Sequence, residues 1–146
     1  QAAEETSAKP IEPIRVVGLI EDDVGTPRND GTRGSALYAV PFRLSKQPRS
    51  EWAEVFQAIW DRPPRFTTMH RPGIARVVGD RIILDGTTLE EVEKYHLETL
   101  KLVVDETNHR IEEFEQVQRK REEQERDRLA KHKEEVKNIA DRLKFD

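Results

Sequence analysis

The chain has 146 residues, of which 35% are hydrophobic and 37% are charged, and its formal net charge at pH 7 is −4. This length and low hydrophobic content allow one small domain plus an extension, and the acidic balance argues against a strongly cationic nucleic-acid-binding protein. The chain has no cysteine, which excludes disulfides and thiolate zinc sites. No apolar run approaches the ~18–20 residues of a membrane span.

The N-terminal part predicts a polar tail followed by two strands. Residues 1–13 are polar and contain two prolines, as in a disordered tail or linker. Ile14–Glu21 is apolar and β-branched, which predicts a strand. The polar run Asp22–Ser35 has acidic residues near glycines, but their spacing matches no EF-hand, so we expect a mobile connection rather than a cation site. Ala36–Leu44 alternates as a strand does, and Pro41 within it predicts an edge or bulged strand.

The middle of the chain predicts a helix and a hairpin. A dense apolar stripe from Ser50 to Trp60 follows start signals at Pro48 and Ser50, and we expect both tryptophans of the chain, which lie in it, to be core residues. Phe66–His70 predicts a further short strand. Gly79-Asp80 is a two-residue hairpin turn, and the register that it sets pairs Val77 with Ile82 and Ala75 with Leu84.

The last 40% of the chain predicts one long helix. Asp85-Gly86 has the composition of a turn, and Thr88 to Glu91 has the pattern of a reciprocal capping box. No glycine or proline follows, so nothing breaks the helix before Leu143. An apolar stripe at helical spacing marks its first half, and we expect His96 on that stripe to be partly buried and hydrogen-bonded. The stripe runs through Leu89, Val92, His96, Leu100, Val103, Thr107, Ile111 and Phe114.

The second half of this helix predicts an interface. Gln118–Arg128 has no apolar residue, and the short heptad stripe after it is too small to be stable in water without a partner helix. Asn108, a polar residue on the helix, is expected to bond a loop or to set the register of a helix pair, so that Asn108→Leu raises stability and loosens oligomer specificity. The predicted interface residues are Ile111, Phe114, Leu129, His132, Val136, Ile139 and Leu143.

These elements predict an α+β fold. We expect a small antiparallel sheet of four or five strands, packed by one short helix and by the N-terminal half of a long C-terminal helix that projects as a coiled-coil-like extension. The predicted divisions are a tail over residues 1–13, a domain over 14–114 and a charged helical segment over 115–146. The chain begins at Gln1 and its one methionine is Met69, which favours a processed protein or an excised fragment.

One feature of the sequence favours nucleic acid. Five arginines lie between Asp61 and Ile82, with His70 and Phe66 nearby, and such a basic face with aromatic residues can bind phosphate or single strands. A solvated strand surface paired with the acidic helix is the simpler interpretation. The five arginines are Arg62, Arg65, Arg71, Arg76 and Arg81.

No set of residues predicts catalysis. The four histidines are too scattered to bind a metal, and there is no nucleophile motif or glycine-rich phosphate loop. We therefore expect no enzyme activity, no cofactor and no metal. The favoured hypothesis is a cytoplasmic, non-enzymatic assembly module that forms a homodimer or docks on a heteromeric protein partner through the long helix. The alternatives are a nucleic-acid-associated accessory protein that uses the arginine face, and a regulatory subunit whose loop Asp22–Ser35 orders on a partner.

Overall fold

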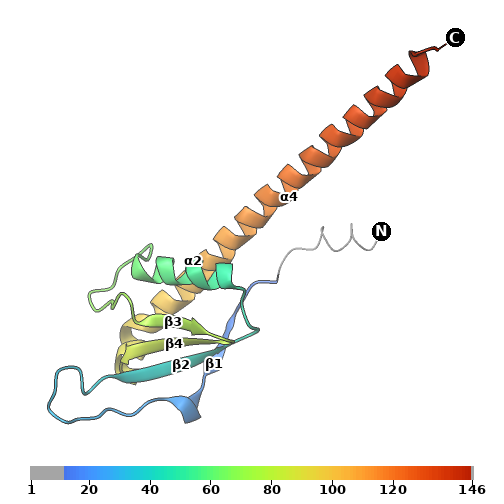
Figure 1. Cartoon of the computed structure of the whole chain (residues 1–146). Helices are drawn as coiled ribbons and strands as arrows, with labels where there is room; N and C mark the ends of the chain where they lie inside the picture. The colour runs from blue at the N-terminus through green and yellow to red at the C-terminus, as the bar shows by residue number, and fades with distance from the viewer. Residues whose placement is uncertain (1–11, 146) are drawn as a thin grey trace. The chain divides into compact units, whose positions relative to one another are not determined.

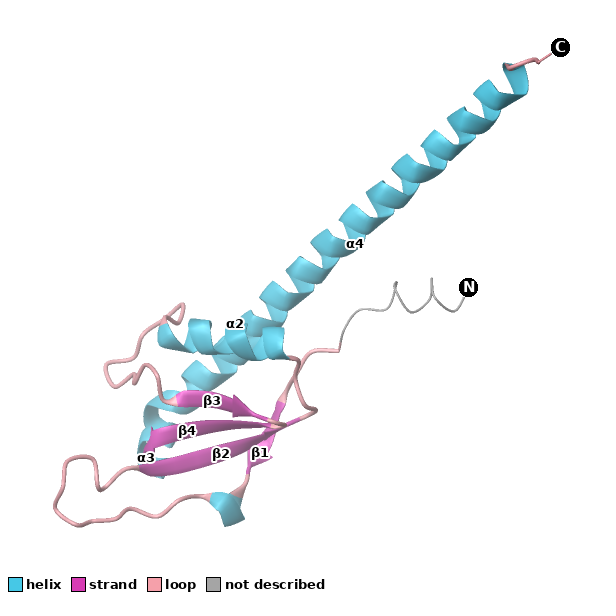
Figure 2. Ribbon diagram, in the orientation of Figure 1, coloured by secondary structure: helices cyan, strands magenta, loops and turns pink. Residues whose placement is uncertain are grey.

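The structure, a computed structural model, describes residues 12–145 and has an α+β fold (Figure 1). Four strands form one antiparallel sheet in the order β1-β2-β4-β3 (Figure 2). They are β1 (Val16–Leu19), β2 (Tyr38–Leu44), β3 (Ala75–Val78) and β4 (Arg81–Thr87). The helices are the short turn η1 (Glu21–Asp23), α2 (Ser50–Asp61), α3 (Leu89–Glu91), the π-helical turn η2 (Val92–His96) and α4 (Leu97–Arg142).

The described chain divides into two compact units, Glu12–Ile111 and residues 112–145. The first contains the sheet, α2 and the first turns of the long helix, and we refer to it as the domain. The second is the remainder of α4 with its C-terminal end, and we refer to it as the helical segment. The predicted tail over residues 1–13 lies almost entirely outside the described residues.

The central hairpin forms as the turn chemistry predicts. Val77 pairs with Ile82 and Ala75 pairs with Leu84, around a turn in which Gly79 has a φ of 60°. Ala75, Ile82 and Leu84 are buried, so this side of the hairpin faces the core. Alternation along β2 places Val40, Phe42 and Leu44 on the same buried face.

Of the two alternatives predicted from Pro41, the edge strand is wrong, because β2 pairs with β1 on one side and with β4 on the other. The other alternative, a bulge, has partial support, because the register shifts between Val16 and Gly18 against β2 and between Tyr38 and Ala39 against β4. The proline lies where β1 ends. Its carbonyl accepts a hydrogen bond from Ile20 N–H (3.0 Å), but its nitrogen has no hydrogen to return to the Ile20 carbonyl. That carbonyl instead accepts from Asp23 N–H (3.1 Å) in the turn η1. An internal strand therefore tolerates a proline because its neighbour turns away at that position.

Gly86 was expected in a turn, but it lies within β4 as a bulge. Tyr38 pairs with Thr87 while Ala39 pairs with Asp85, which leaves Gly86 as the extra residue. Its φ is 115°, a conformation that glycine adopts without strain. The bulge brings β4 directly to the start of α3.

The core lies between one face of the sheet and two helices. From α2 it takes Trp52, Phe56, Ile59 and Trp60, all 5% exposed or less, which confirms the prediction for the tryptophans. From the long helix it takes Val92, Leu100, Val103 and Val104. The aromatic rings of α2 stack along the helix, with centroids of Trp52 and Phe56 5.4 Å apart.

Phe66–His70 is not the further strand that the sequence predicts. Side-chain bonds to backbone hold this loop in place of a strand ladder. His70 Nε2 lies 2.7 Å from the Trp60 carbonyl oxygen, and Trp60 Nε1 donates to the Arg71 carbonyl (3.0 Å). The contacts of His70 and Arg71 with Trp60 thus close the loop over the end of α2.

The long helix runs over 54 residues from Leu89 to Arg142. Thr88 Oγ1 accepts from Glu91 N–H (3.1 Å), as the capping-box pattern predicts. The reciprocal bond does not form, because the Glu91 carboxylate binds the Arg71 guanidinium instead. The helix also contains a π-helical turn, η2, that the sequence did not predict.

Asn108 joins the helix to the chain that enters β1. Its Oδ1 accepts from Ile14 N–H (3.0 Å) and from Trp52 Nε1 (2.8 Å), while its Nδ2 donates to the Ile14 carbonyl (2.8 Å). The side-chain oxygen thus accepts two hydrogen bonds and the side-chain nitrogen donates one, all inside the domain. Of the two predicted roles, the bond to a neighbouring segment is the one observed, and the expectation that Asn108→Leu stabilises the protein loses its basis.

Candidate functional site

The predicted interface residues fall into two groups in the structure. Ile111 is half-buried and packs on the domain core. The others lie in the helical segment, where none of residues 112–145 is buried. The five from Leu129 on lie at spacings of three and four residues, which places them on one helical face. We call them the C-terminal stripe: Leu129, His132, Val136, Ile139 and Leu143.

The C-terminal stripe exposes large apolar side chains. Its four apolar members are between 49% and 58% exposed, and Phe114 earlier in the helical segment is 58% exposed. Single exposed apolar residues are common on protein surfaces, but an aligned stripe is typical of an interaction surface. Around it the helix is highly charged and held locally by pairs such as Arg128 with Glu125, whose closest N–O distance is 2.6 Å.

The five arginines of the predicted basic face do not act together. Arg71 pairs with Glu91, Arg76 with Asp85 (3.2 Å) and Arg81 with Asp23 (2.8 Å). Each of these guanidiniums is thus partly neutralised within the domain. Arg62 and Arg65 are exposed in the loop after α2. The nucleic-acid alternative stays a prediction, and a phosphate would have to compete with three carboxylates on this face.

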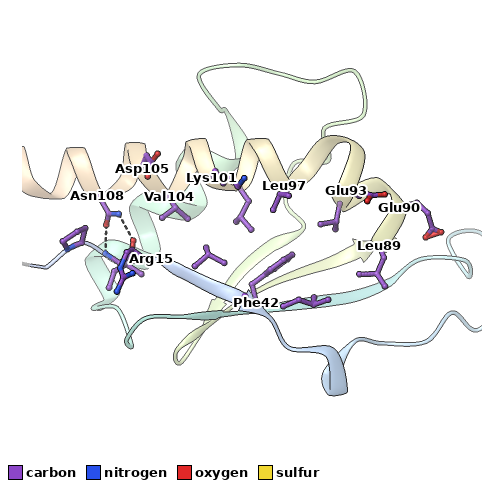
Figure 3. A pocket seen from close by; sticks show the side chains of 17 residues that line it. Arg15, Phe42, Leu89, Glu90, Glu93, Leu97, Lys101, Val104, Asp105 and Asn108 are labelled. Carbon is purple, nitrogen blue, oxygen red and sulfur yellow. Dashed lines mark hydrogen bonds between the residues drawn. The ribbon is translucent and has the colours of Figure 1, made fainter.

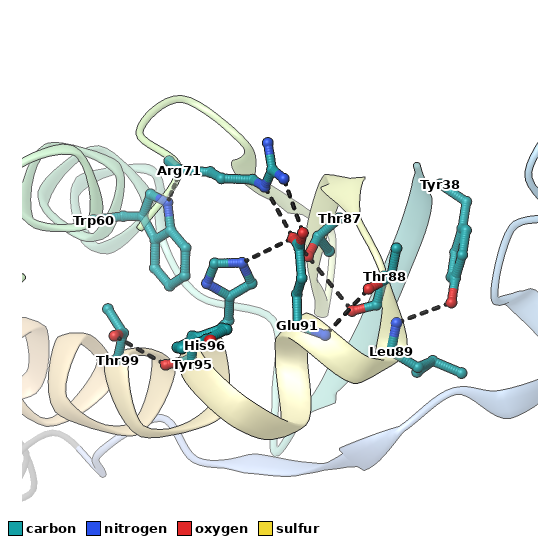
Figure 4. A network of polar contacts seen from close by, with 10 residues as sticks. All are labelled: Tyr38, Trp60, Arg71, Thr87, Thr88, Leu89, Glu91, Tyr95, His96 and Thr99. Carbon is teal, nitrogen blue, oxygen red and sulfur yellow. Dashed lines mark hydrogen bonds and ion pairs between the residues drawn. The ribbon is translucent and has the colours of Figure 1, made fainter. Parts of the chain in front are cut away.

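A partly buried polar network lies where the long helix begins (Figure 4). Arg71 Nε and Nη2 donate to the two oxygens of the Glu91 carboxylate, at 2.9 and 2.8 Å. Thr87 Oγ1, which is fully buried, also donates to Glu91 (2.9 Å). The bond to Arg71 is the main cause that lowers the pKa of Glu91 to about 2. This double bond ties the loop before β3 to the first turn of the helix.

His96 completes this network at the end of the π-helical turn. It is fully buried, and its Nε2 lies 3.6 Å from a Glu91 oxygen, so neither ring nitrogen has a hydrogen-bond partner among the described residues. It is therefore buried as predicted, but not hydrogen-bonded. Burial lowers the pKa of His96, and the nearby Glu91 carboxylate opposes that shift. The ring packs beside Trp60, with centroids 6.0 Å apart.

The network has the residue types of a catalytic site but not the chemistry. A carboxylate with a pKa of about 2 is a weak base for the Thr87 hydroxyl, and that hydroxyl has no exposure to a substrate. Among residues 12–145 no three His, Asp or Glu side chains are grouped so as to bind a metal ion. We conclude that the network holds the start of the long helix on the domain.

An apolar groove of about 1050 Å³ runs along the domain between β1 and the long helix (Figure 3). Phe42, Val92 and Leu100, all nearly fully buried, contribute to it from β2 and the helix. One wall comes from the segment of β1 and the other from the helix, between Leu89 and Asn108. Charged residues also line it: Arg15, Glu90, Glu93, Lys101 and Asp105.

The groove exists because the helical layer covers only part of the sheet. On the β3 side α2 provides cover, and its Gln57 side chain donates to the Ala75 carbonyl (3.3 Å). The strand β1 lies at the opposite edge of the sheet. A Cβ added to Gly18 in β1 would meet no atom within 4 Å, so the space above this strand is open. The bonds between Asn108 and Ile14 tie the two walls together at one end.

Comparison with known proteins gives no relative from which a function can be transferred: no family model, no curated protein and no solved structure matches this chain. Within residues 12–145, no helix is both long and apolar enough to cross a membrane. Any proposal about function therefore rests on the surfaces of the molecule itself.

Sequence reasoning found the C-terminal stripe but missed the groove and the Arg71–Glu91 pair. The stripe has a helical period that can be read from the sequence. The groove joins residues from β1 and the long helix that are at least 70 positions apart, and only the tertiary structure brings them together. The capping-box pattern did mark Glu91 as a carboxylate at the start of the helix, where it can also bind a cationic side chain. Nothing in the sequence identified Arg71 as that partner.

Proposed function

We propose that this protein is a non-enzymatic assembly module that associates with a second copy, or docks on another protein, through its long C-terminal helix. The observation that carries this proposal is the exposure of Leu129, Val136, Ile139 and Leu143 on one face of a continuous helix. Removing such a stripe from water against a partner is favourable at about 25 cal/mol per Å² of apolar surface. A helix that is otherwise charged gains nothing in solution from keeping these side chains exposed.

The chemistry of the domain supports a binding role rather than catalysis. Its most perturbed carboxylate, Glu91, is held by Arg71 and serves as a structural anchor. The guanidiniums of Arg71, Arg76 and Arg81 are paired with carboxylates, so they are less available for phosphate. The C-terminal stripe and the groove, by contrast, present apolar surface that a partner can cover.

The test compares two double variants by light scattering across a concentration series. Val136→Glu with Ile139→Glu places two carboxylates on the C-terminal stripe. Ala130→Glu with Asn138→Glu adds the same charge to exposed positions outside it. We expect the wild type and the Ala130/Asn138 control to show the same mass above that of a monomer, and the stripe variant to shift to the monomer.

Salt separates this proposal from the nucleic-acid alternative. Phosphate-driven binding weakens steeply as salt is raised, whereas apolar helix pairing does not. Association that is lost between low and moderate salt would favour the arginine face. A wild-type chain that stays monomeric at every concentration would remove self-association, and a search for a heteromeric partner would then use the same stripe variant as its negative control.

A further inference from the structure

The helical layer of the domain lacks a member over β1. Sheets with helices on one face are normally covered across their width, but here α2 lies over β3, and the groove is left between β1 and the long helix. Its walls include Leu19 and Leu89, both 39% exposed. Water therefore reaches apolar surface that an additional helix would cover.

We propose that this groove is the acceptor for the C-terminal stripe of a second copy of the chain. The inference rests on the proposed function and deepens it, since it names the surface that the stripe binds. The stripe has anchors at positions i, i+3 and i+7 from Leu129, which is the pattern of an amphipathic helix in an apolar groove. One chain thus carries both halves of the contact.

The sizes of the two surfaces agree. At 1.5 Å per residue, the helical wall of the groove from Leu89 to Asn108 is roughly 28 Å long, and the stripe from Leu129 to Leu143 is roughly 21 Å long. The groove volume of about 1050 Å³ is also at the upper end of what a small-molecule pocket provides, which is roughly 300–1,000 Å³. A helix face with large aliphatic side chains fits this space better than a compact ligand.

The charges of the two surfaces have opposite net sign. The groove is lined by three carboxylates and two cationic side chains, with Glu90 and Glu93 grouped at its Leu89 end (Figure 3). The positions that flank the stripe are Arg128, Lys133, Glu135, Ala140 and Arg142, three cations against one carboxylate. Such complementarity speeds association and disfavours like-charged partners more than it adds affinity.

Each such contact is heterologous, because it joins the stripe of one copy to the groove of another. Two copies that exchange stripes reciprocally form a closed dimer with two equal contacts, while one-way exchange forms an open chain of copies. Both arrangements predict the same result for a mixture of two variants. A copy with a damaged groove keeps its stripe, and a copy with a damaged stripe keeps its groove, so the two copies can still form one intact contact. Direct pairing of two stripes does not predict this rescue, because the groove then has no part in the contact.

The test uses two full-length variants and their mixture in sedimentation velocity. Gly18→Phe fills the groove from β1, where the structure has open space, and Val17→Phe at the neighbouring exposed position outside the groove is its control. Val136→Glu with Ile139→Glu damages the stripe. We expect at least a tenfold weaker self-association for each damaged variant alone, no such loss for the Val17→Phe control, and a 1:1 complex when the two damaged variants are mixed.

The outcomes separate the inference from the proposed function. If Gly18→Phe associates like the wild type, the groove is not the acceptor, and the helical proposal stands without it. Failure of the mixture to form a complex, when each variant alone is monomeric, also overturns the inference. If the stripe variant associates like the wild type, both proposals fail. Should Gly18→Phe lower the urea midpoint, Leu89→Gln at the more exposed end of the helical wall replaces it in the same experiment.

Discussion

The domain and the helical segment share one helix but differ in what their apolar residues do. Between Leu89 and Ile111 the apolar stripe packs on the sheet, and Leu100 and Val103 are essentially fully buried. Beyond residue 112 an apolar stripe with the same helical spacing has no buried member. The difference shows that periodicity identifies the apolar face of a helix but not what buries that face. Burial comes from other parts of the chain or from another molecule.

The sharpest test of this comparison uses one kind of substitution in both regions. Ile82→Ala in the fully buried core should lower the free energy of unfolding by about 2–5 kcal/mol, because it leaves a cavity. Ile139→Ala at a half-exposed position should change it by less than about 0.5 kcal/mol in a dilute, monomeric sample. Urea unfolding followed by fluorescence of the two tryptophans measures both. Similar losses would mean that the helical segment is packed in the monomer.

Two asparagines of the same helix extend the test to polar groups. Asn108→Leu should lower the free energy of unfolding by about 2–3 kcal/mol, because Ile14 and the Trp52 indole lose their hydrogen-bond partner. Asn138→Leu, in the exposed helical segment, is the matched control and should leave the urea midpoint nearly unchanged. A stabilised Asn108→Leu variant would show that the amide serves a helix pair after all.

The Arg71–Glu91 pair makes the stability of the domain depend on acid. The pKa of Glu91 is lowered to about 2 from an ordinary value of 4.5, so the unfolded chain binds a proton below pH 4.5 that the folded chain does not. The pair therefore stabilises the fold at neutral pH and ceases to do so as pH falls from about 4.5 to about 2. Because Arg71 is one-third exposed and water screens the pair, we expect a loss of about 1–2 kcal/mol.

Urea unfolding at pH 7, 4 and 3 checks this prediction. Glu91→Gln should be less stable than the wild type at pH 7, and the gap should narrow at pH 3. Glu134→Gln, which removes a carboxylate of the exposed helical segment, is the control and should follow the wild-type pH profile. A gap between Glu91→Gln and the wild type that stays constant from pH 7 to pH 3 would contradict the assignment.

The smallest effect that we expect comes from His96. Burial lowers its pKa, while the Glu91 carboxylate opposes the shift and the neighbouring His70 and Arg71 reinforce it. The unfolded chain therefore binds a proton before the folded chain does as pH falls below about 6.5, and this difference favours unfolding. Stability should thus decline from pH 6.5 towards 5. Replacing His96 by Leu should flatten this decline, whereas His132→Gln on the exposed helix should not.

Much of the secondary structure could be predicted from local sequence patterns. The turn at Gly79-Asp80, the alternation of β2, the stripe of α2 and the Thr88 cap each depend on neighbours within a few residues, and all four form as predicted. The sequence also indicated which helical face is apolar. These features are local because backbone geometry and side-chain period determine them before any long-range contact forms.

The errors arose where distant residues compete. Pro41 lies in an internal strand because β1 turns away beside it. Phe66–His70 is a loop whose His70 side chain lies within hydrogen-bond distance of the Trp60 carbonyl at the end of α2. The Glu91 carboxylate accepts from Arg71, twenty residues away in sequence, instead of from the backbone of Thr88. In each case a contact across the chain is stronger than the local preference that the sequence displays.

The sequence by itself determined four strands, the helix α2 and the long helix, together with their apolar faces and the apolar stripe on the last helical turns. Only the tertiary structure decided which face is covered, where Asn108 bonds, and that β1 and the long helix enclose an open groove. The physical reason is the distance along the chain over which each effect acts. Helical and strand periods act between neighbours, whereas burial depends on which segments far apart in the chain come together.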